Sequence, residues 1–404
     1  MRVTITPGRL SGAVTPPASK SQCHRLIIAA SLARGTSVLH NISPSQDIAA
    51  TLRCMQALGA VDEGETIQGI PAHPVYPDLP LLNCGESGST LRFLVPVALA
   101  VAGGGVFTGQ GRLMERPMEP YEDICRQQGI RYDRTPEGLR VRGTLHPGIF
   151  ELPGDVSSQF ITGLLFALPL LGEESEIVLT SRLQSAGYVE MTLDALQRFG
   201  VQVETTKTGW RIPGNQHYRP QTLTAEGDWS QAAFWLSAGM LGSPVMLRGM
   251  DPKSIQGDRI IQTYCRRLSG EGPVALDVGQ CPDLAPALAL IAALRTGELT
   301  LLVNAGRLRL KESDRIESIT AALSALGAKI TADEDSMSIT GVARLSGGVC
   351  QSWNDHRIAM MLAIAATRAA SPVTILGAEC VAKSYPKFWA DYAALGGQFT
   401  EESP

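Results

Sequence analysis

The chain has 404 residues, of which 44% are hydrophobic and 18% are charged, and its formal net charge is −4. This length exceeds the usual size of a single hydrophobic core, so we expect a globular protein of two domains. The small net charge argues against a general affinity for nucleic acid or anionic membranes, so any anion binding must come from locally placed Lys and Arg.

The first ten residues lack the apolar core of a signal peptide, which favours a cytosolic protein. The longest uncharged stretch, residues 93–111, contains Pro96 and three consecutive glycines, so it predicts a buried helix followed by a turn and no membrane span. The eight cysteines form no C-x-x-C pair and no zinc-type Cys/His cluster. We therefore expect reduced, buried thiols, no metal and no organic cofactor.

Six segments share one pattern, in which a polar cap precedes about a dozen apolar residues, a Gly or Pro break and a β-branched run. They begin near Ser21, Ser87, Ser157, Asp228, Asp283 and Asp355. Most starts lie about 70 residues apart and one interval, after Asp228, is about 55, which indicates six copies of a duplicated unit.

A second helix in each unit is expected to end at a glycine. These glycines are Gly59, Gly129, Gly200, Gly270, Gly327 and Gly397. Their spacing has its short interval at the same place as the first series, which supports the repeat.

Six units divide most simply into two domains of three. Residues 213–227 have little apolar periodicity and are expected to contain the domain break. We predict one domain of residues 14–225 and a second of residues 1–13 with 226–404. The opening strand, residues 3–5, is expected to belong with the last units, so that the chain crosses between the domains twice.

Hydroxyl and basic residues gather at the expected helix starts, in residues 19–25, 87–92, 157–159 and 355–357. A helix N-terminus offers free N–H groups and the positive end of its dipole, so these groups together predict anion sites. The alternative is that Ser, Thr and Asp only cap their helices. Basic residues oppose the dipole there, so Lys20 and Arg357 favour the anion site.

Three further segments are rich in charge: residues 115–118 before a helix, residues 307–315, and the surroundings of Lys383. Residues 307–310 alternate like a strand before the pattern becomes helical. The alternative for residues 307–315 is a solvated helix start with local ion pairs.

The strings ASKSQCHR, GESGSTLR, ERPM, SSQF, PDLAPAL, RLKESDR, NDHRIAM and AKSYPKF stand in the order seen in EPSP synthases. RLKESDR followed by NDHR is a specific pair, and the resemblance covers nearly the whole chain. The resemblance implies an α/β fold with two domains, each an inside-out α/β barrel of three βαβαββ units. It also implies substrates bound in the cleft between the domains.

The implied activity is transfer of the enolpyruvyl group of phosphoenolpyruvate to the 5-hydroxyl of shikimate 3-phosphate. By resemblance, shikimate 3-phosphate contacts Lys20, Ser21, Arg25, Ser157, Ser158, Gln159, Ser185, Tyr188, Asp283 and Lys311. Phosphoenolpyruvate contacts Lys20, Gly88, Arg116, Gln159, Arg315, Arg357 and Lys383.

The resemblance makes Asp283 the base near the 5-hydroxyl, Glu312 the acid at the methylene carbon, and Lys20 the partner of the departing phosphate. Asp283 has the alternative of capping its helix. Weaker candidates are His356, Arg92 and Arg307. His356 has an alternative role in positioning Asp355 or a helix end.

Glu86 and Ser89 stand where many EPSP synthases have Asn and Thr, and Arg307 where some have Asn. The substrate hydrogen bonds at these positions, and any response to glyphosate, therefore stay open. Gly88 retains the small side chain that close approach of phosphoenolpyruvate requires.

Two alternatives remain. One is a transferase acting on UDP-N-acetylglucosamine, which usually carries a Cys where this chain has Gly111. The other is a non-catalytic anion-binding relative, which would have lost Lys20, Asp283 or Glu312. We expect a monomer that acts on small molecules, without nucleic-acid or membrane partners.

Overall fold

The computed structural model describes residues 1–72 and 74–402. The chain forms two compact units, one of Lys20–Ala225 and one of Met1–Ser19 with Glu226–Pro404. This border differs from the predicted one by residues 14–19, because strand β2 (Gly12–Val14) pairs in parallel with β15 (Val245–Leu247). Among the described residues, no helix has the length and apolarity needed to cross a bilayer.

A complete repeat occupies residues 81–142. Its elements are β6 (Leu81–Asn83), α3 (Gly88–Ala102), β7 (Gly104–Thr108), α4 (Glu119–Gln127), β8 (Arg131–Thr135) and β9 (Gly138–Arg142). β6 lies parallel to β7, and β9 lies antiparallel to both β7 and β8, which gives the sheet order β6-β7-β9-β8. This is the βαβαββ unit implied by the resemblance.

Two further units repeat the same strand order without interruption. The first contains β10 (Ile149–Leu152), α5 (Ser158–Ala167), β11 (Ser175–Leu179), α6 (Ala186–Arg198), β12 (Glu204–Thr205) and β13 (Gly209–Ile212). The second contains β16 (Val274–Asp277), α9 (Ala285–Ala293), β17 (Leu299–Val303), α10 (Arg315–Ala325), β18 (Lys329–Ala332) and β19 (Ser336–Thr340).

Two units take one strand from a distant part of the chain. The first, with α1 (Lys20–Leu32), β3 (Thr36–His40), α2 (Gln46–Ala57), β4 (Val61–Asp62) and β5 (Thr66–Gln68), takes β14 (Thr222–Thr224). The last, with β20 (Gly348–Gln351), α11 (His356–Ala365), β21 (Val373–Leu376), α12 (Phe388–Ala394) and β22 (Gln398–Glu402), takes β1 (Arg2–Thr6). The prediction that the opening strand belongs with the last units is confirmed, because β1 pairs with β21 and β22.

The remaining unit is truncated. It contains α7 (Trp229–Met240), β15 and α8 (Ile261–Leu268), and its sheet is the pair β15-β2. In the other units an antiparallel strand pair completes the sheet, whereas the described chain here passes from α8 directly to β16. This missing pair of strands explains the short interval in both sequence series.

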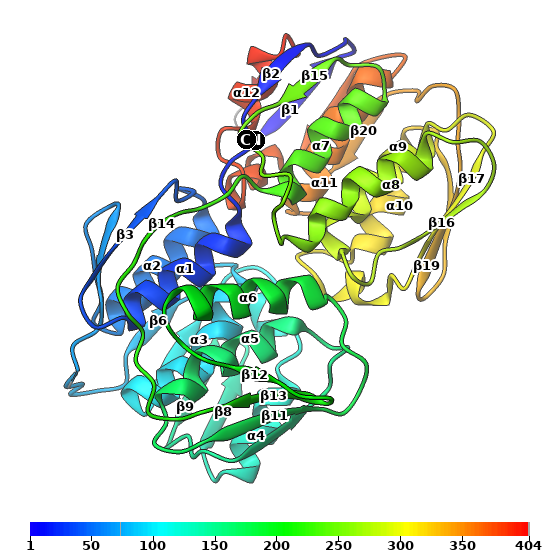
Figure 1. The fold of residues 1–404 in the computed structure, drawn as a ribbon. Helices are drawn as coiled ribbons and strands as arrows, with labels where there is room; N and C mark the ends of the chain where they lie inside the picture. The colour runs from blue at the N-terminus through cyan, green and yellow to red at the C-terminus, as the bar shows by residue number, and fades with distance from the viewer. Residues whose placement is uncertain (73, 403–404) are drawn as a thin grey trace. The chain divides into compact units, whose positions relative to one another are not determined.

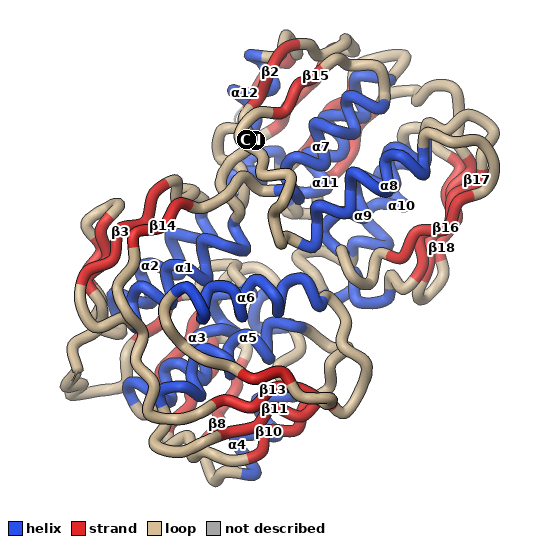
Figure 2. Tube along the Cα trace, viewed as in Figure 1, coloured by secondary structure: helices blue, strands red, loops and turns tan. Residues whose placement is uncertain are grey.

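In each of the two compact units, the principal helices of the repeats lie inside and the sheets lie outside (Figures 1 and 2). Every residue of α9 and of α11 is buried, and so are all but one of α5. A helix that is buried all round must be apolar all round, which accounts for the continuous apolar runs in these segments. All eight cysteines are free and buried, as predicted.

Most of the predicted terminal glycines follow their helices with positive φ, namely Gly59, Gly129, Gly200 and Gly327. After α12 the positive φ belongs to Gly396 in place of Gly397, and after α8 it belongs to Gly272 in place of Gly270. These two predictions were therefore misplaced. Their helices end in double-glycine or Gly-x-Gly sequences, in which either glycine can take the left-handed conformation.

Candidate functional site

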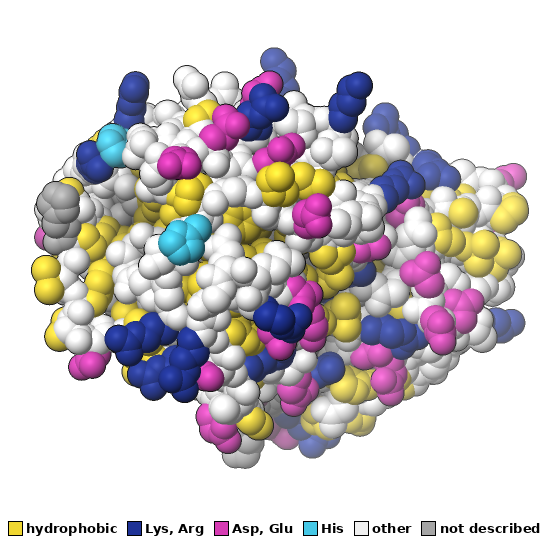
Figure 3. Space-filling view, turned by 90° about the horizontal axis from the view of Figure 1, so that it is seen from below, with side chains coloured by type: hydrophobic (Ala, Val, Ile, Leu, Met, Phe, Trp, Pro, Cys, Tyr) yellow, Lys and Arg dark blue, Asp and Glu magenta, His cyan; other side chains and the backbone are white. Residues whose placement is uncertain are grey.

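Basic side chains on the face drawn in Figure 3 are interspersed with acidic ones, apart from one compact group of Lys and Arg. The basic residues predicted to bind anions are mostly buried instead: Arg25, Arg92, Arg116, Arg315, Arg357 and Lys383. Burying a charge is costly unless it is paired. Their contacts define a cluster in each of the two units, and we describe each cluster separately.

Arg315 is the centre of the cluster in the unit that contains residues 226–404. It is the first residue of α10, and its side chain is 1% exposed. Its Nε lies 2.8 Å from Asp355 Oδ2 and its Nη1 lies 2.9 Å from Asp283 Oδ1. Its Nη2 lies 2.7 Å from Glu312 Oε2. One guanidinium thus holds three carboxylates from three separate segments, two of which are the predicted base and acid.

Asp283 lies in a 3-10 turn, Pro282–Leu284, just before α9. The helix has no side-chain cap, so the alternative that Asp283 is its N-cap is wrong. The carboxylate instead makes a second ion pair, of 2.7 Å, with Arg357. Burial favours the neutral acid, but Arg357, Lys311 and Arg315 outweigh it and hold the pKa of Asp283 well below its usual range. Asp283 is therefore an ion-paired carboxylate in this state.

Asp355 caps α11 by accepting a hydrogen bond of 2.9 Å from the backbone N–H of Arg357. It also accepts one of 3.1 Å from Ser313 Oγ, so it joins α11 to the start of α10. His356 is buried, and its Nδ1 lies 4.0 Å from Asp355 Oδ1. Its placement beside this cap is compatible with the positioning role.

The chain enters α11 through a strained turn. Trp353 and Asn354 have φ of 50° and 54°, a conformation that is rare for a bulky side chain such as Trp. Lys383, at the end of a 3-10 segment (Ala378–Lys383), donates a hydrogen bond of 2.6 Å to the carbonyl of Asn354. Such strain persists where surrounding contacts hold it and is frequent at functional sites.

Residues 306–310 form a 3-10 helix, not the expected strand start. The turn between β18 and β19 holds this segment. Asp335 accepts a hydrogen bond of 2.6 Å from Gly306 N, and Arg309 donates to the carbonyls of Asp333 and Glu334. Lys311 follows this segment. Burial lowers its pKa to about 8, with Arg307 contributing and Asp283 opposing.

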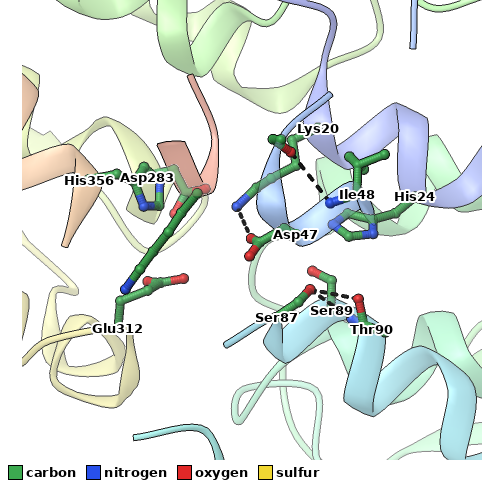
Figure 4. A network of polar contacts seen from close by, with 12 residues as sticks. Lys20, His24, Asp47, Ile48, Ser87, Ser89, Thr90, Asp283, Glu312 and His356 are labelled. Carbon is green, nitrogen blue, oxygen red and sulfur yellow. Dashed lines mark hydrogen bonds and ion pairs between the residues drawn. The ribbon is translucent and has the colours of Figure 1, made fainter. Parts of the chain in front are cut away.

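In the unit of residues 20–225, Lys20 is the first residue of α1 and forms a 2.6 Å ion pair with Asp47 (Figure 4). Asp47 lies in the first turn of α2, after the cap Ser45. Both side chains are largely buried, at 13% and 11% exposed. Sequence reasoning missed Asp47, although an acid in the first turn of a capped helix in the same repeat was a usable signal.

Arg25 ties α1 to α6. It donates to Thr192 Oγ1 at 2.9 Å and to the carbonyls of Tyr188 and Ser21 at 2.7 and 2.6 Å. Burial lowers the pKa of Arg25 to about 9, so the side chain remains protonated at neutral pH. α6 begins after Ser185, which has a positive φ of 57°. The predicted residues Ser21, Arg25, Ser185 and Tyr188 are thus brought together.

The start of α3 meets the start of α5 through Gln159. Its Oε1 accepts a hydrogen bond of 2.8 Å from Arg92, and its Nε2 donates one of 3.0 Å to Ser89 Oγ. A Cβ at Gly88 would collide with the guanidinium of Arg116, so glycine permits this close approach.

Ser157 caps α5 by accepting a hydrogen bond of 3.3 Å from Gln159 N, and Ser158 is the first helical residue. The predicted residues of this segment therefore stand at one helix start. Helix starts, hydroxyls and guanidiniums of this kind can bind phosphate and carboxylate groups, and the carboxylates around Arg315 can move protons.

A protein-family model described as EPSP synthase (3-phosphoshikimate 1-carboxyvinyltransferase) matches residues 5–392. The 3-phosphoshikimate 1-carboxyvinyltransferase of Clostridium kluyveri is 44% identical over 422 residues, covering 99% of each chain. That of Clostridium perfringens is 44% identical over 425 residues, covering 99% of this chain and 100% of the relative. An EPSP synthase structure from Acinetobacter baumannii matches with a TM-score of 0.80 at 26% identity, over 99% of this chain and 100% of that one. Family model, relatives and fold agree, and the chain belongs to the EPSP synthase (3-phosphoshikimate 1-carboxyvinyltransferase) family of transferases.

Proposed function

We propose that this protein transfers the enolpyruvyl group of phosphoenolpyruvate to the 5-hydroxyl of shikimate 3-phosphate and releases inorganic phosphate. This reaction belongs to the shikimate pathway of aromatic amino-acid biosynthesis. The observation that carries the proposal is the ion-paired group around Arg315, which joins Asp283, Glu312 and Asp355. It combines carboxylates for proton transfer with a guanidinium that can bind an anionic substrate.

Shikimate 3-phosphate is proposed to bind hydroxyls, cations and a carboxylate that lie at or near helix starts. The residues are Lys20, Ser21, Arg25, Ser157, Ser158, Gln159, Ser185, Tyr188, Asp283 and Lys311. Support comes from Arg25, a buried cation joined to Ser21 and to Tyr188 by hydrogen bonds to their carbonyls. All three of its nitrogens already donate hydrogen bonds, to Thr192, Ser21 and Tyr188. We therefore assign it mainly an electrostatic part in binding.

Phosphoenolpyruvate is proposed to bind the start of α3 and a set of buried guanidiniums. The residues are Lys20, Gly88, Arg116, Gln159, Arg315, Arg357 and Lys383. Arg92 and Arg307 support these groups. Arg92 does so by holding Gln159, and Arg307 by adding positive charge near Lys311. An arginine fork donates in pairs, which suits a carboxylate or phosphate better than an ammonium does.

The chemistry is addition followed by elimination. Asp283 takes the proton of the 5-hydroxyl, while Glu312 protonates the methylene carbon of phosphoenolpyruvate and later removes a proton. Asp283 is a weak base while Arg315 and Arg357 hold it. An arriving phosphate or carboxylate competes for these guanidiniums. Its negative charge offsets theirs, which raises the pKa of Asp283 and so its basicity. Substrate binding therefore activates the base.

Lys20 is proposed to neutralise the departing phosphate. Its ammonium is paired with Asp47 at 2.6 Å, so the substrate phosphate must compete with this carboxylate. His356 is proposed to position Asp355. The protein is further proposed to work as a cytoplasmic monomer on these two small molecules, without nucleic acid or membrane, and its eight free cysteines suit a reducing compartment.

The decisive experiment is release of inorganic phosphate from phosphoenolpyruvate, measured with and without shikimate 3-phosphate. We expect release that depends on both. Release that depends on UDP-N-acetylglucosamine would establish the first alternative, and no release with either acceptor would establish a non-catalytic relative. Neither alternative has support from the relatives, which carry the 3-phosphoshikimate name.

The pH dependence of kcat/KM should reveal Lys311. This quantity reports the free enzyme, in which the pKa of Lys311 is lowered to about 8. The ammonium is charged below that pH and neutral above it, so kcat/KM for shikimate 3-phosphate should fall as pH rises through about 8. In Lys311→Arg the charge persists, and the alkaline fall should move upward by more than one pH unit.

Lys253→Arg is the matched control, because Lys253 is exposed and lies outside the candidate site. Its profile should match that of the wild type. An alkaline fall near pH 8 that persists in Lys311→Arg would assign the ionisation to another group.

A further inference from the structure

A line of buried side chains crosses three helices in the unit of residues 20–225. His24 Nδ1 of α1 lies 2.7 Å from Thr51 Oγ1 of α2, which lies 2.7 Å from Thr90 Oγ1 of α3. Thr90 Oγ1 then lies 2.7 Å from Ser87 Oγ. All four residues are at most 1% exposed. Figure 4 shows His24, Thr90 and Ser87, the last two joined by a dashed line.

The line ends on the hydroxyl that caps α3. Ser87 Oγ accepts hydrogen bonds from both the backbone N–H and the hydroxyl of Thr90. The next residue, Gly88, is a proposed contact of phosphoenolpyruvate. Ser89, which follows it, accepts a hydrogen bond from Gln159, another proposed contact. An N-cap fixes the direction of the free N–H groups in the first turn, so the position of Ser87 sets how this helix start faces a ligand.

The direction of each hydrogen bond along the line follows from the number of protons that its groups carry. Each hydroxyl has one proton, and Thr90 gives its proton to Ser87. Thr90 must then accept from Thr51, and Thr51 must accept from His24. The imidazole therefore carries its proton on Nδ1. Its Nε2, which has no hydrogen-bond partner among the described residues, stays unprotonated.

The surroundings of His24 favour this single-proton form. Burial, with Lys20 and Arg25 adding to it, lowers the pKa of His24 well below its usual value. The ring also packs edge-on against Phe93, with centroids 6.2 Å apart at 87°. A neutral imidazole is thus held as a fixed hydrogen-bond donor.

We propose that His24 is a positioning residue for phosphoenolpyruvate: its Nδ1–H orders Thr51, Thr90 and Ser87 and so fixes the N-terminus of α3. This role goes beyond the contacts assigned above and rests on the proposed function. His24 touches no substrate in it. It acts through the cap, and its loss should weaken phosphoenolpyruvate binding more than shikimate 3-phosphate binding.

The test compares His24→Leu with His24→Asn. Leu and Asn have nearly the same shape, but the Asn amide can place a donor near the position of Nδ1, whereas Leu removes it. We expect His24→Leu to raise KM for phosphoenolpyruvate about tenfold, the effect of one buried hydrogen bond, with KM for shikimate 3-phosphate changed less than threefold. His24→Asn should recover most of the loss.

Thr51→Val breaks the same line at the next link without changing its size. Because both substitutions interrupt one network, the double variant His24→Leu/Thr51→Val should be little worse than either single variant. Equal increases in both KM values, failure of Asn to restore binding, or full additivity would each overturn the proposal.

Amide hydrogen exchange tests the role of His24 independently of the proposed function, because the measurement needs no substrate. The amides of Thr90 and Leu91 donate to Ser87. They should exchange faster in His24→Leu than in the wild type, and His24→Asn should restore slow exchange. If the wild type releases no phosphate with shikimate 3-phosphate, the proposed function fails while the exchange result still tests the line. Unchanged exchange in His24→Leu would overturn the positioning role even in an active enzyme.

Discussion

Replacing Glu312 by alanine should lower kcat by about a hundredfold or more, as expected when general acid–base help is removed. Glu312 contacts Arg315 from the same segment, at 2.7 Å, and its side chain is 18% exposed, so its removal opens little of the core. The two other carboxylates still pair with Arg315. The affinity for shikimate 3-phosphate should therefore remain close to that of the wild type.

The measurement is kcat from phosphate release, together with the Kd for shikimate 3-phosphate from calorimetry. Glu312→Gln keeps the size of the side chain and should be nearly as slow as the alanine variant, because an amide cannot exchange a proton with carbon. Glu317→Ala is the matched control, since Glu317 is an exposed glutamate in the first turn of α10, five residues after Glu312. Turnover in Glu312→Ala within a few-fold of the wild type would remove Glu312 from the proposed chemistry.

The helix starts could be predicted from sequence because their determinants are local. Ser87, Ser157, Asp228 and Asp355 each cap their helices through their own side chains, within three residues of the groups they satisfy. The same spacing of caps revealed the repeat. The truncated repeat was also visible in the sequence, because its missing pair of strands shortens the interval between successive helix caps.

The contacts between segments could not be predicted in this way. Arg315 pairs with Asp283 and Asp355, which lie 32 and 40 positions away in sequence. Each carboxylate is compatible with a simple cap when read alone, and only the packing of α9, α10 and α11 brings them to one guanidinium. Sequence likewise assigned Lys20 a substrate but not its partner Asp47, which lies on another helix.

The segment before Lys311 shows a different limit. The alternation of Arg307 to Leu310 suits an exposed strand, yet the segment is a 3-10 helix. The backbone N–H of Gly306 and the side chain of Arg309 both bond to the turn at residues 333–335, so a hairpin later in the chain holds the segment in place. Tertiary contacts override a short periodic pattern most easily where, as here, only four residues carry it.

Replacing Arg315 by methionine should be the most damaging single change in the chain. Arg315 is 1% exposed and pairs with three carboxylates, of which Asp355 is fully buried. Removing one partner of a buried ion pair costs about 3–5 kcal/mol, because the remaining charge is left without compensation. Turnover should fall by about a hundred- to a thousandfold as well, since a donor for the substrate anion is lost.

Two further variants, Arg315→Lys and Arg266→Met, distinguish loss of the three ion pairs from a nonspecific effect of replacing an arginine. Lysine keeps the charge but not the three-way fork, so we expect it to recover part of the stability and little of the turnover. Arg266 is an exposed arginine of α8, and its replacement should leave stability within about 0.5 kcal/mol of the wild type.

The pH dependence of stability provides an independent check on the role of Arg315. In the wild type the pKa of Asp283 is held below its usual value, with Arg315 among the causes. A depressed carboxyl pKa stabilises the fold above the unfolded-state pKa of about 3.9, and this contribution is lost as pH falls through and below that value. The stability difference between the wild type and Arg315→Met should therefore be large at pH 7 and should narrow below about pH 4. Urea unfolding at both pH values measures it, and a difference that is small at pH 7 or constant with pH would show that the ion pairs of Arg315 do not stabilise the fold.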